Sequence, residues 1–150
     1  MNQLKRMIQR VQTIYLLVAA MISGGLIFIA RLWTEASNQK VFVGDLLSNP
    51  SILIKTILFS FLTSSLLSIL AIFLFKNRQL QFVVGRVNMI INFYLLGVLI
   101  YVSQTISGET IVSEKGIGMF FPIIVVVLLV MANKAIKKDE DLVKSVDRLR

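Results

Sequence analysis

Long apolar runs recur four times along the chain, and charged residues stand mostly at their ends. The runs cover residues 11–31, 56–75, 80–102 and 116–132. An α-helix rises about 1.5 Å per residue and the hydrocarbon core of a bilayer is about 30 Å thick, so about twenty apolar residues cross it. The pattern predicts an all-α integral membrane fold: a four-transmembrane-helix bundle in which residues 1–150 form a single domain.

Two of these runs have another interpretation when each is read alone. The first lies where a signal peptide would lie, but its apolar stretch is longer than the roughly 7–15 residues of a signal core, and three more runs follow. The Val and Ile residues at 123–127 favour a strand in water, whereas an isolated strand in lipid leaves its backbone groups unpaired. We therefore expect retained helices at both places.

Lysine and arginine are distributed unequally between the two ends of the predicted bundle. Twelve of the 16 lie in the N-terminal segment, in residues 76–86 and in the C-terminal tail, and four lie in or beside the loops 33–55 and 103–115. Cytoplasmic segments carry the excess of positive charge. The count predicts that both termini are cytoplasmic and that both loops are outside, where a small strand pairing between them is an option.

Composition narrows the chemistry that is open to this chain. It has no Cys and no His, which removes disulfides, thiolate nucleophiles, imidazole bases and zinc sites built on these ligands. No Asp or Glu lies inside a span, which argues against proton-coupled or cation-coupled transport. The net charge is +8, and most of the Lys and Arg residues stand at the ends of the apolar runs, where they would contact lipid headgroups. We expect no enzyme activity, no metal, no cofactor and no nucleic-acid binding.

Polar residues on the second and third spans form one face each. Serines recur every four residues on the second span, and Gln81, Gly85, Asn88 and Asn92 share a face of the third. We expect hydrogen bonds between the two faces, with tight packing favoured over a polar groove that binds a ligand. Arg86 lies off this face and is expected to snorkel to the headgroups. The candidates for helix contact or groove are Ser60, Ser64, Ser68, Asn88, Asn92, Gly24 and Gly25.

The tail, residues 133–150, is predicted to be a cytoplasmic helical extension of the fourth span. Its apolar residues fall mostly on one helical face, which needs a partner: a protein, the lipid surface or the N-terminal segment. Leu4, Ile8 and Val11 form a matching short stripe, so packing of the two stripes on each other is an equal alternative. The candidates for docking a partner are Ile136, Leu142, Val143, Val146 and Leu149.

The two ends of the chain also carry a resemblance. Residues 7–17 read MIQRVQTIYLL and residues 132–150 read ANKAIKKDEDLVKSVDRLR. Together with the four-span layout, they resemble a family of uncharacterised small inner-membrane proteins of the Bacteroidota. The resemblance implies a multi-pass protein of the bacterial inner (cytoplasmic) membrane and brings no activity or catalytic residues with it.

These observations favour a non-catalytic accessory or scaffold subunit of an inner-membrane protein complex, which docks through its cytoplasmic ends. The alternative is a small permease, or a binder of lipid or a small molecule, with a polar groove between spans two and three. The expected partners are membrane lipid and other membrane or cytoplasmic proteins, and a homo-oligomer is left open.

Overall fold

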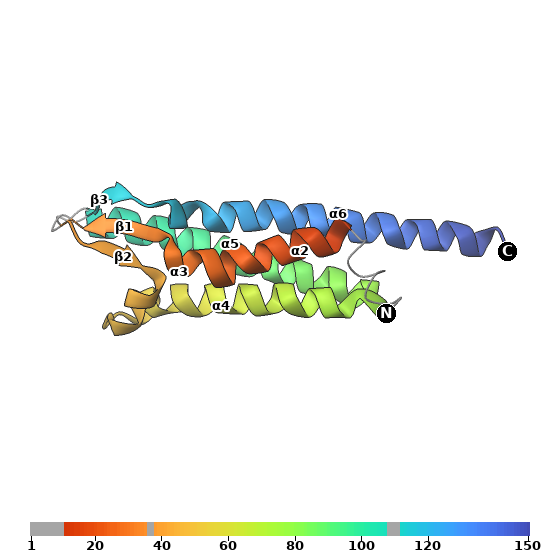
Figure 1. The fold of residues 1–150 in the computed structure, drawn as a ribbon, viewed down its shortest axis with the longest axis horizontal. Coiled ribbons are helices and arrows are strands. Elements are labelled where there is room, and N and C mark those ends of the chain that lie inside the picture. Colours follow the sequence, from red (N-terminus) through yellow and green to blue (C-terminus); the bar gives the residue numbers. More distant parts are fainter. Residues whose placement is uncertain (1–10, 36–37, 108–111) are drawn as a thin grey trace.

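Four long helices run side by side in the computed structural model, which describes residues 11–35, 38–107 and 112–150 (Figure 1). The first consists of α2 (Val11–Met21), the π-helical η1 (Ile22–Leu26) and α3 (Ile27–Ile29). The others are α4 (Ile52–Phe73), α5 (Arg78–Ser107) and α6 (Phe121–Arg148). All four are long and apolar enough to cross a membrane, which confirms the predicted number of candidate spans.

Several helices extend beyond the apolar runs that predicted them. α4 begins at Ile52 and therefore includes Lys55, whose backbone N–H donates to the Ser51 carbonyl at 3.2 Å. α5 continues to Ser107, and α6 runs without interruption into the tail. Charge marks where an apolar run stops, but lysine is a good helix former and does not end a helix.

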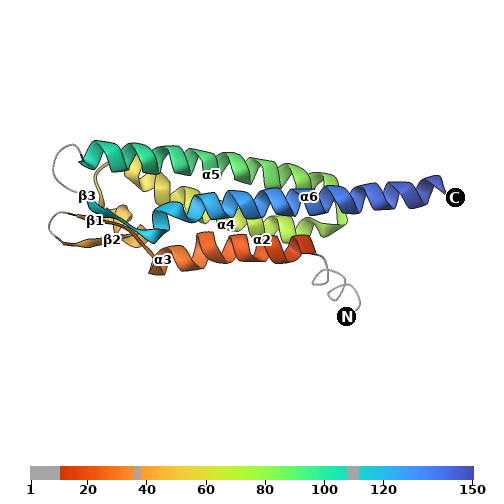
Figure 2. The same cartoon turned by 90° about the horizontal axis from the view of Figure 1, so that it is seen from above.

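A three-stranded antiparallel sheet closes one end of the bundle, which we call the sheet end (Figure 2). Its strands are β1 (Arg31–Glu35), β2 (Lys40–Phe42) and β3 (Val112–Lys115), in the order β2-β1-β3. The expected pairing between the two loops is present as β1 with β3, and β2 adds a third strand. The 3₁₀-helix η2 (Val43–Ser48) follows β2, so the loop at 33–55 is more ordered than its sequence indicates.

Gly116 joins the sheet to α6 through η4 (Ile117–Phe120). Its N–H donates to the Leu32 carbonyl at 2.8 Å, and a Cβ at this position would lie 2.7 Å from both the Arg31 carbonyl carbon and the Leu32 oxygen. Leu32 and Trp33 are buried beneath this contact. Only glycine allows the backbone of β1 to approach so closely.

The opposite end, where α2 begins and α6 ends, is called here the terminal end (Figure 1). Between the two ends the core contains large apolar side chains from all four helices, among them Leu16, Phe61, Leu95 and Leu129. Apolar side chains also cover the outside of the bundle: Ile52 is 80% exposed and Phe73 is 67% exposed. Soluble proteins rarely expose so much contiguous apolar surface, so the bundle is that of a multi-pass membrane protein.

Candidate functional site

Several polar side chains are buried in the interior of the bundle, in the half nearest the terminal end. We call this set the polar interior; it consists of Gln12, Ser64, Ser68, Gln81, Asn88, Asn92 and Asn133. Each of them is at most 6% exposed. On α5 the set extends from Gln81 to Asn92, which is about 16 Å at the helical rise per residue.

Hydrogen bonds connect the asparagines of α5 to the serines of α4. The Asn88 amide donates to Ser68 Oγ at 2.8 Å and to the Ser64 carbonyl at 3.1 Å, and the Asn92 amide donates to Ser64 Oγ at 2.8 Å. The Asn92 amide also donates to Asn88 Oδ1 at 3.1 Å. The hydrogen bonds expected between these faces are thus present. Because all four side chains are almost completely buried, they form a closed contact rather than an open groove.

Two glutamines extend this network to a third helix. Gln81 Nε2 on α5 donates to the Ala71 carbonyl of α4 at 2.8 Å, and Gln12 Nε2 on α2 donates to Gln81 Oε1 at 3.3 Å. Gln12 was missed as a site residue. It is spaced at a helical repeat from Leu16 and Ala19, which are buried on α2, and from Ser23, which is buried in η1. This repeat would have placed it on the inner face.

Asn133 connects the fourth helix to the same interior. Its Nδ2 donates to the Phe82 carbonyl of α5 at 3.4 Å. A Cβ on Gly85 would lie 3.0 Å from Asn133 Cγ, so this glycine provides the space that Asn133 occupies. Among the described residues, Asn92 Oδ1, Asn133 Oδ1 and Thr13 Oγ1 are buried acceptors without a hydrogen-bond partner. Each unsatisfied group of this kind costs about 1–3 kcal/mol, so the polar interior is not fully compensated.

Gly24 and Gly25, both candidates for helix contact, have different surroundings. Gly24 faces Ser65 of α4: an added Cβ would lie 2.9 Å from Ser65 Cβ, and Ser65 Oγ itself donates to the Ala20 carbonyl at 3.1 Å. Nothing lies within 4 Å of a Cβ on Gly25. Gly24 is therefore the residue that lets α4 approach this segment, and Gly25 is not.

We predict that Gly24→Val lowers the free energy of unfolding by about 1–3 kcal/mol, because the added atoms overlap Ser65. The matched change Gly25→Val should leave it nearly unchanged. The midpoint of thermal unfolding in mild detergent compares the two variants. Equal midpoints for the two would contradict the assigned contact.

Ser60 and Arg86 lie outside the polar interior. Ser60 lines a surface depression of about 310 Å³ together with Thr63 and Tyr94, and the Tyr94 hydroxyl lies 3.0 Å from Thr56 Oγ1. Arg86 is exposed, and its guanidinium carbon lies 4.4 Å from the centre of the Phe82 ring. This cation–π contact holds the charge on the outside of α5.

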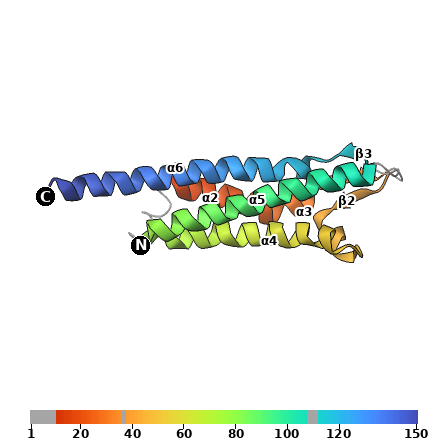
Figure 3. The ribbon, with the colours of Figure 1, turned by 180° about the vertical axis from the view of Figure 1, so that it is seen from behind.

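At the terminal end, α6 extends past the other helices (Figure 3). Leu142, Val143, Val146 and Leu149 are 57%, 43%, 58% and 89% exposed. Ile136 differs from these four: it is 0% exposed, because α6 is still packed within the bundle at that residue. Ile136 is therefore a core residue and not an accessible docking residue, which corrects the sequence-based prediction.

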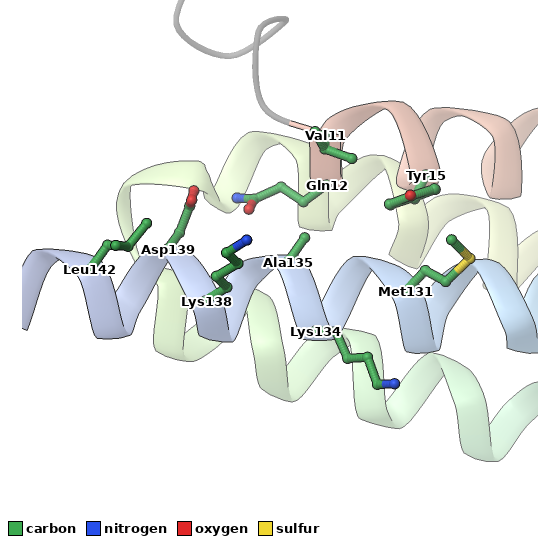
Figure 4. A pocket seen from close by; sticks show the side chains of 9 residues that line it. All are labelled: Val11, Gln12, Tyr15, Met131, Lys134, Ala135, Lys138, Asp139 and Leu142. Atoms are coloured by element: carbon green, nitrogen blue, oxygen red, sulfur yellow. The ribbon is translucent and has the colours of Figure 1, made fainter.

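A groove of about 580 Å³ lies between the first turns of α2 and the adjoining part of α6 (Figure 4). Val11, Gln12 and Tyr15 form its α2 side. Met131, Ala135 and Leu142 rise toward α2 from α6, whereas Lys134 points away. The groove is thus continuous with the exposed apolar residues of the extension.

Leu4 and Ile8 lie outside the described residues, so packing of the two terminal stripes remains a prediction.

Comparison with known proteins assigns the chain to a family. The family model described as a domain of unknown function (DUF4293) matches residues 8–149, nearly the whole chain. No curated protein and no solved structure matches it.

Proposed function

We propose that this chain, which belongs to the family of the domain of unknown function DUF4293, is a non-catalytic accessory or scaffold subunit of a bacterial inner-membrane complex. In this proposal the terminal end is cytoplasmic, so the orientation is N-in/C-in and docking occurs through the cytoplasmic ends. The positive charge concentrated near both termini supports this orientation. The resemblance of both ends to small membrane proteins of the Bacteroidota supports the assignment to that group.

The observation that carries the proposal is the projection of α6 beyond the bundle. Residues 141–150 are exposed at every position, yet four of them are Leu or Val. An exposed apolar stripe on a helix outside the hydrocarbon region has no lipid tails to contact, and such stripes mark contact surfaces for proteins. The extension is therefore the part of the molecule most suited to holding a partner.

The hydrogen bonds of the polar interior support a structural role for the polar residues of α4 and α5. Ser64, Ser68, Asn88 and Asn92 use their hydrogen bonds on each other and on backbone carbonyls. Such bonds between membrane helices stabilise the bundle by about 0.6 kcal/mol each on average. A permease or small-molecule binder remains the alternative, and the hydroxyl-lined depression at Ser60 is the observation that favours it.

The test removes only the part of α6 that lies outside the bundle. A chain lacking residues 141–150 keeps Ile136 and the groove residues up to Asp139. We expect it to fold, to insert, and to lose at least one protein that co-purifies with the full chain in a gentle detergent. An unchanged set of co-purifying proteins would refute the docking proposal.

Point variants separate the apolar stripe from the rest of the extension. Val146→Gln with Leu149→Gln removes apolar contacts, and we expect the same loss of partner as in the truncated chain. Lys137→Gln with Lys144→Gln is the matched control on the opposite side of the helix. Lys144 forms a surface ion pair with Glu140 at 2.8 Å, and an ion pair so exposed to solvent contributes little to stability. This control should retain the partner.

A further inference from the structure

The apolar stripe of the extension lies on the side of α6 that faces α2. On α6, the groove between these two helices is lined by Met131, Ala135 and Leu142. Val146 and Leu149 follow Leu142 at steps of four and three residues, which keeps them on the same face of a helix. The groove and the stripe therefore form one apolar track along α6, and α6 continues past the start of α2 (Figure 1).

The uncovered part of this track starts where α2 starts. Val11, the first residue of α2, lines the groove, and residues 1–10 precede it in the sequence. A helix that continued α2 backwards through these ten residues would be about 15 Å longer. From Asp139, which lines the groove, α6 runs about 14 Å to its end at Arg148. The two lengths agree, and residues 1–10 contain no Gly or Pro that would interrupt a helix.

The N-terminal segment also has the spacing that this track requires. Leu4, Ile8 and Val11 recur at steps of four and three residues, and Tyr15, which lines the groove, continues the series. On a helix continuous with α2 these residues share one face. Leu4 and Ile8 would therefore face α6, as Val11 and Tyr15 do in the groove.

The two segments carry opposite net charge. Residues 1–10 contain three basic residues and no acidic one, whereas residues 139–147 contain four acidic residues and one basic one. Packed helices lie about 8–10 Å apart, which is close to the Debye length at physiological ionic strength, so the two segments attract each other. Glu140 and Asp147 lie on the back of α6, so this attraction favours the approach, and the apolar residues determine how the segments align.

We propose that residues 1–10 form a helix that runs antiparallel to α6 and covers the groove and the stripe. In this arrangement Ile8 packs against Leu142, and Leu4 lies between Leu142 and Val146. The stripe is then the binding surface of the chain's own N-terminal segment, and a partner that uses the stripe must displace this segment. This second step rests on the proposed function, whereas the packing itself does not.

Two other occupants fit the track less well. A helix of a second copy that lay along the whole track would overlap α2, which already lies on this side of α6 (Figure 4). For an anionic lipid headgroup, the three lysines at 134, 137 and 138 are offset by the three acidic residues at 139–141. A continuation of α2 meets neither obstacle.

Paired cysteines test the packing, because the chain has no cysteine of its own. The full chain carrying Leu4→Cys with either Leu142→Cys or Val146→Cys, oxidised mildly in native membranes, should form a disulfide within the chain. This bond protects both thiols from a maleimide that carries a polyethylene glycol tag, and reduction restores the tagging.

Leu4→Cys with Lys144→Cys is the matched control, because residue 144 lies at the same height on the opposite side of α6. We expect at least tenfold less protection in this pair. Equal protection in the control and in the Val146→Cys and Leu142→Cys pairs would overturn the proposal. Covalent dimers in place of the intrachain bond would assign the stripe to a second copy and would also overturn it.

Polar substitutions in the N-terminal segment test the second step. Leu4→Gln with Ile8→Gln removes the apolar contacts, so we expect at least threefold more of the partner that is lost when residues 141–150 are deleted. Arg6→Gln, on the opposite side of the predicted helix, is the control and should leave the recovery unchanged. Unchanged recovery from the Leu4→Gln, Ile8→Gln chain would refute the displacement of the segment by the partner.

The thiol protection and the docking test give independent answers. Protection of the cysteines at 4 and 146, combined with an unchanged set of co-purifying proteins after truncation, would refute the proposed function and leave the packing intact. Loss of a co-purifying protein on truncation, without protection in either cysteine pair, would refute the packing alone.

Discussion

Replacing Gly116 with valine is expected to lower the free energy of unfolding by about 3 kcal/mol, at the upper end of overpacking effects. The new Cβ would lie 2.7 Å from the Arg31 carbonyl carbon and from the Leu32 oxygen. These are backbone atoms of β1, the central strand, so they cannot move aside without breaking the pairing with β2 or β3. Thermal unfolding in mild detergent, followed by circular dichroism, measures the loss.

Gly44 provides the matched control for this change. It lies in η2, between β2 and α4, and nothing lies within 4 Å of a Cβ built on it. Gly44→Val should unfold at nearly the same temperature as the original chain. If Gly116→Val and Gly44→Val gave the same midpoint, the close approach of β1 to Gly116 would be refuted.

The second large effect is expected at the asparagines of α5. Asn88→Leu combined with Asn92→Leu removes both amides from the polar interior and leaves the Ser64 and Ser68 hydroxyls without these donors. We expect a loss of about 1–3 kcal/mol in the free energy of unfolding, the cost of unpaired buried groups. Adding Ser64→Ala and Ser68→Ala should lower the free energy of unfolding less in this variant than in the original chain, because the asparagine amides that donate to these serines are already absent.

Thr63→Leu is the matched control for the asparagine variants. Thr63 is exposed on α4, and its hydroxyl donates to the Phe59 carbonyl of its own helix at 2.7 Å. This change should leave stability nearly unaltered. Unchanged stability in the Asn88→Leu, Asn92→Leu chain, together with loss of a transport or ligand-binding activity, would instead support the permease alternative.

The helices were predictable because a run of apolar residues long enough to cross lipid has few other stable conformations. The ends of the helices were not predictable. The length of an apolar run reflects the thickness of the bilayer, and a helix can continue beyond the run, as α5 does to Ser107. β1 was hidden for a related reason. Leu32 and Trp33 directly follow the first apolar run and are themselves apolar, so no change of periodicity marks the start of the strand.

The polar interior was predictable where its residues repeat along one helix. Ser64 and Ser68, like Asn88 and Asn92, are four residues apart and thus share a face. Gln12 and Asn133 are single polar residues near the ends of apolar runs, and their partners Gln81 and Phe82 lie on another helix. Periodicity could have placed Gln12 on an inner face, but finding the partners of both residues requires knowing which helices are neighbours, which periodicity does not give. Ile136 was misassigned for the same reason.

Beyond Asn92, the inner face of α5 changes character. Leu95, Leu99 and Val102 are 0%, 1% and 3% exposed, and they occupy about 10 Å of the helix axis toward the sheet end. An ion that entered from the terminal end would have to shed its hydration water to pass this hydrocarbon plug, at a prohibitive energy. In this conformation the apolar segment of α5 blocks a hydrated path along the inside of the bundle.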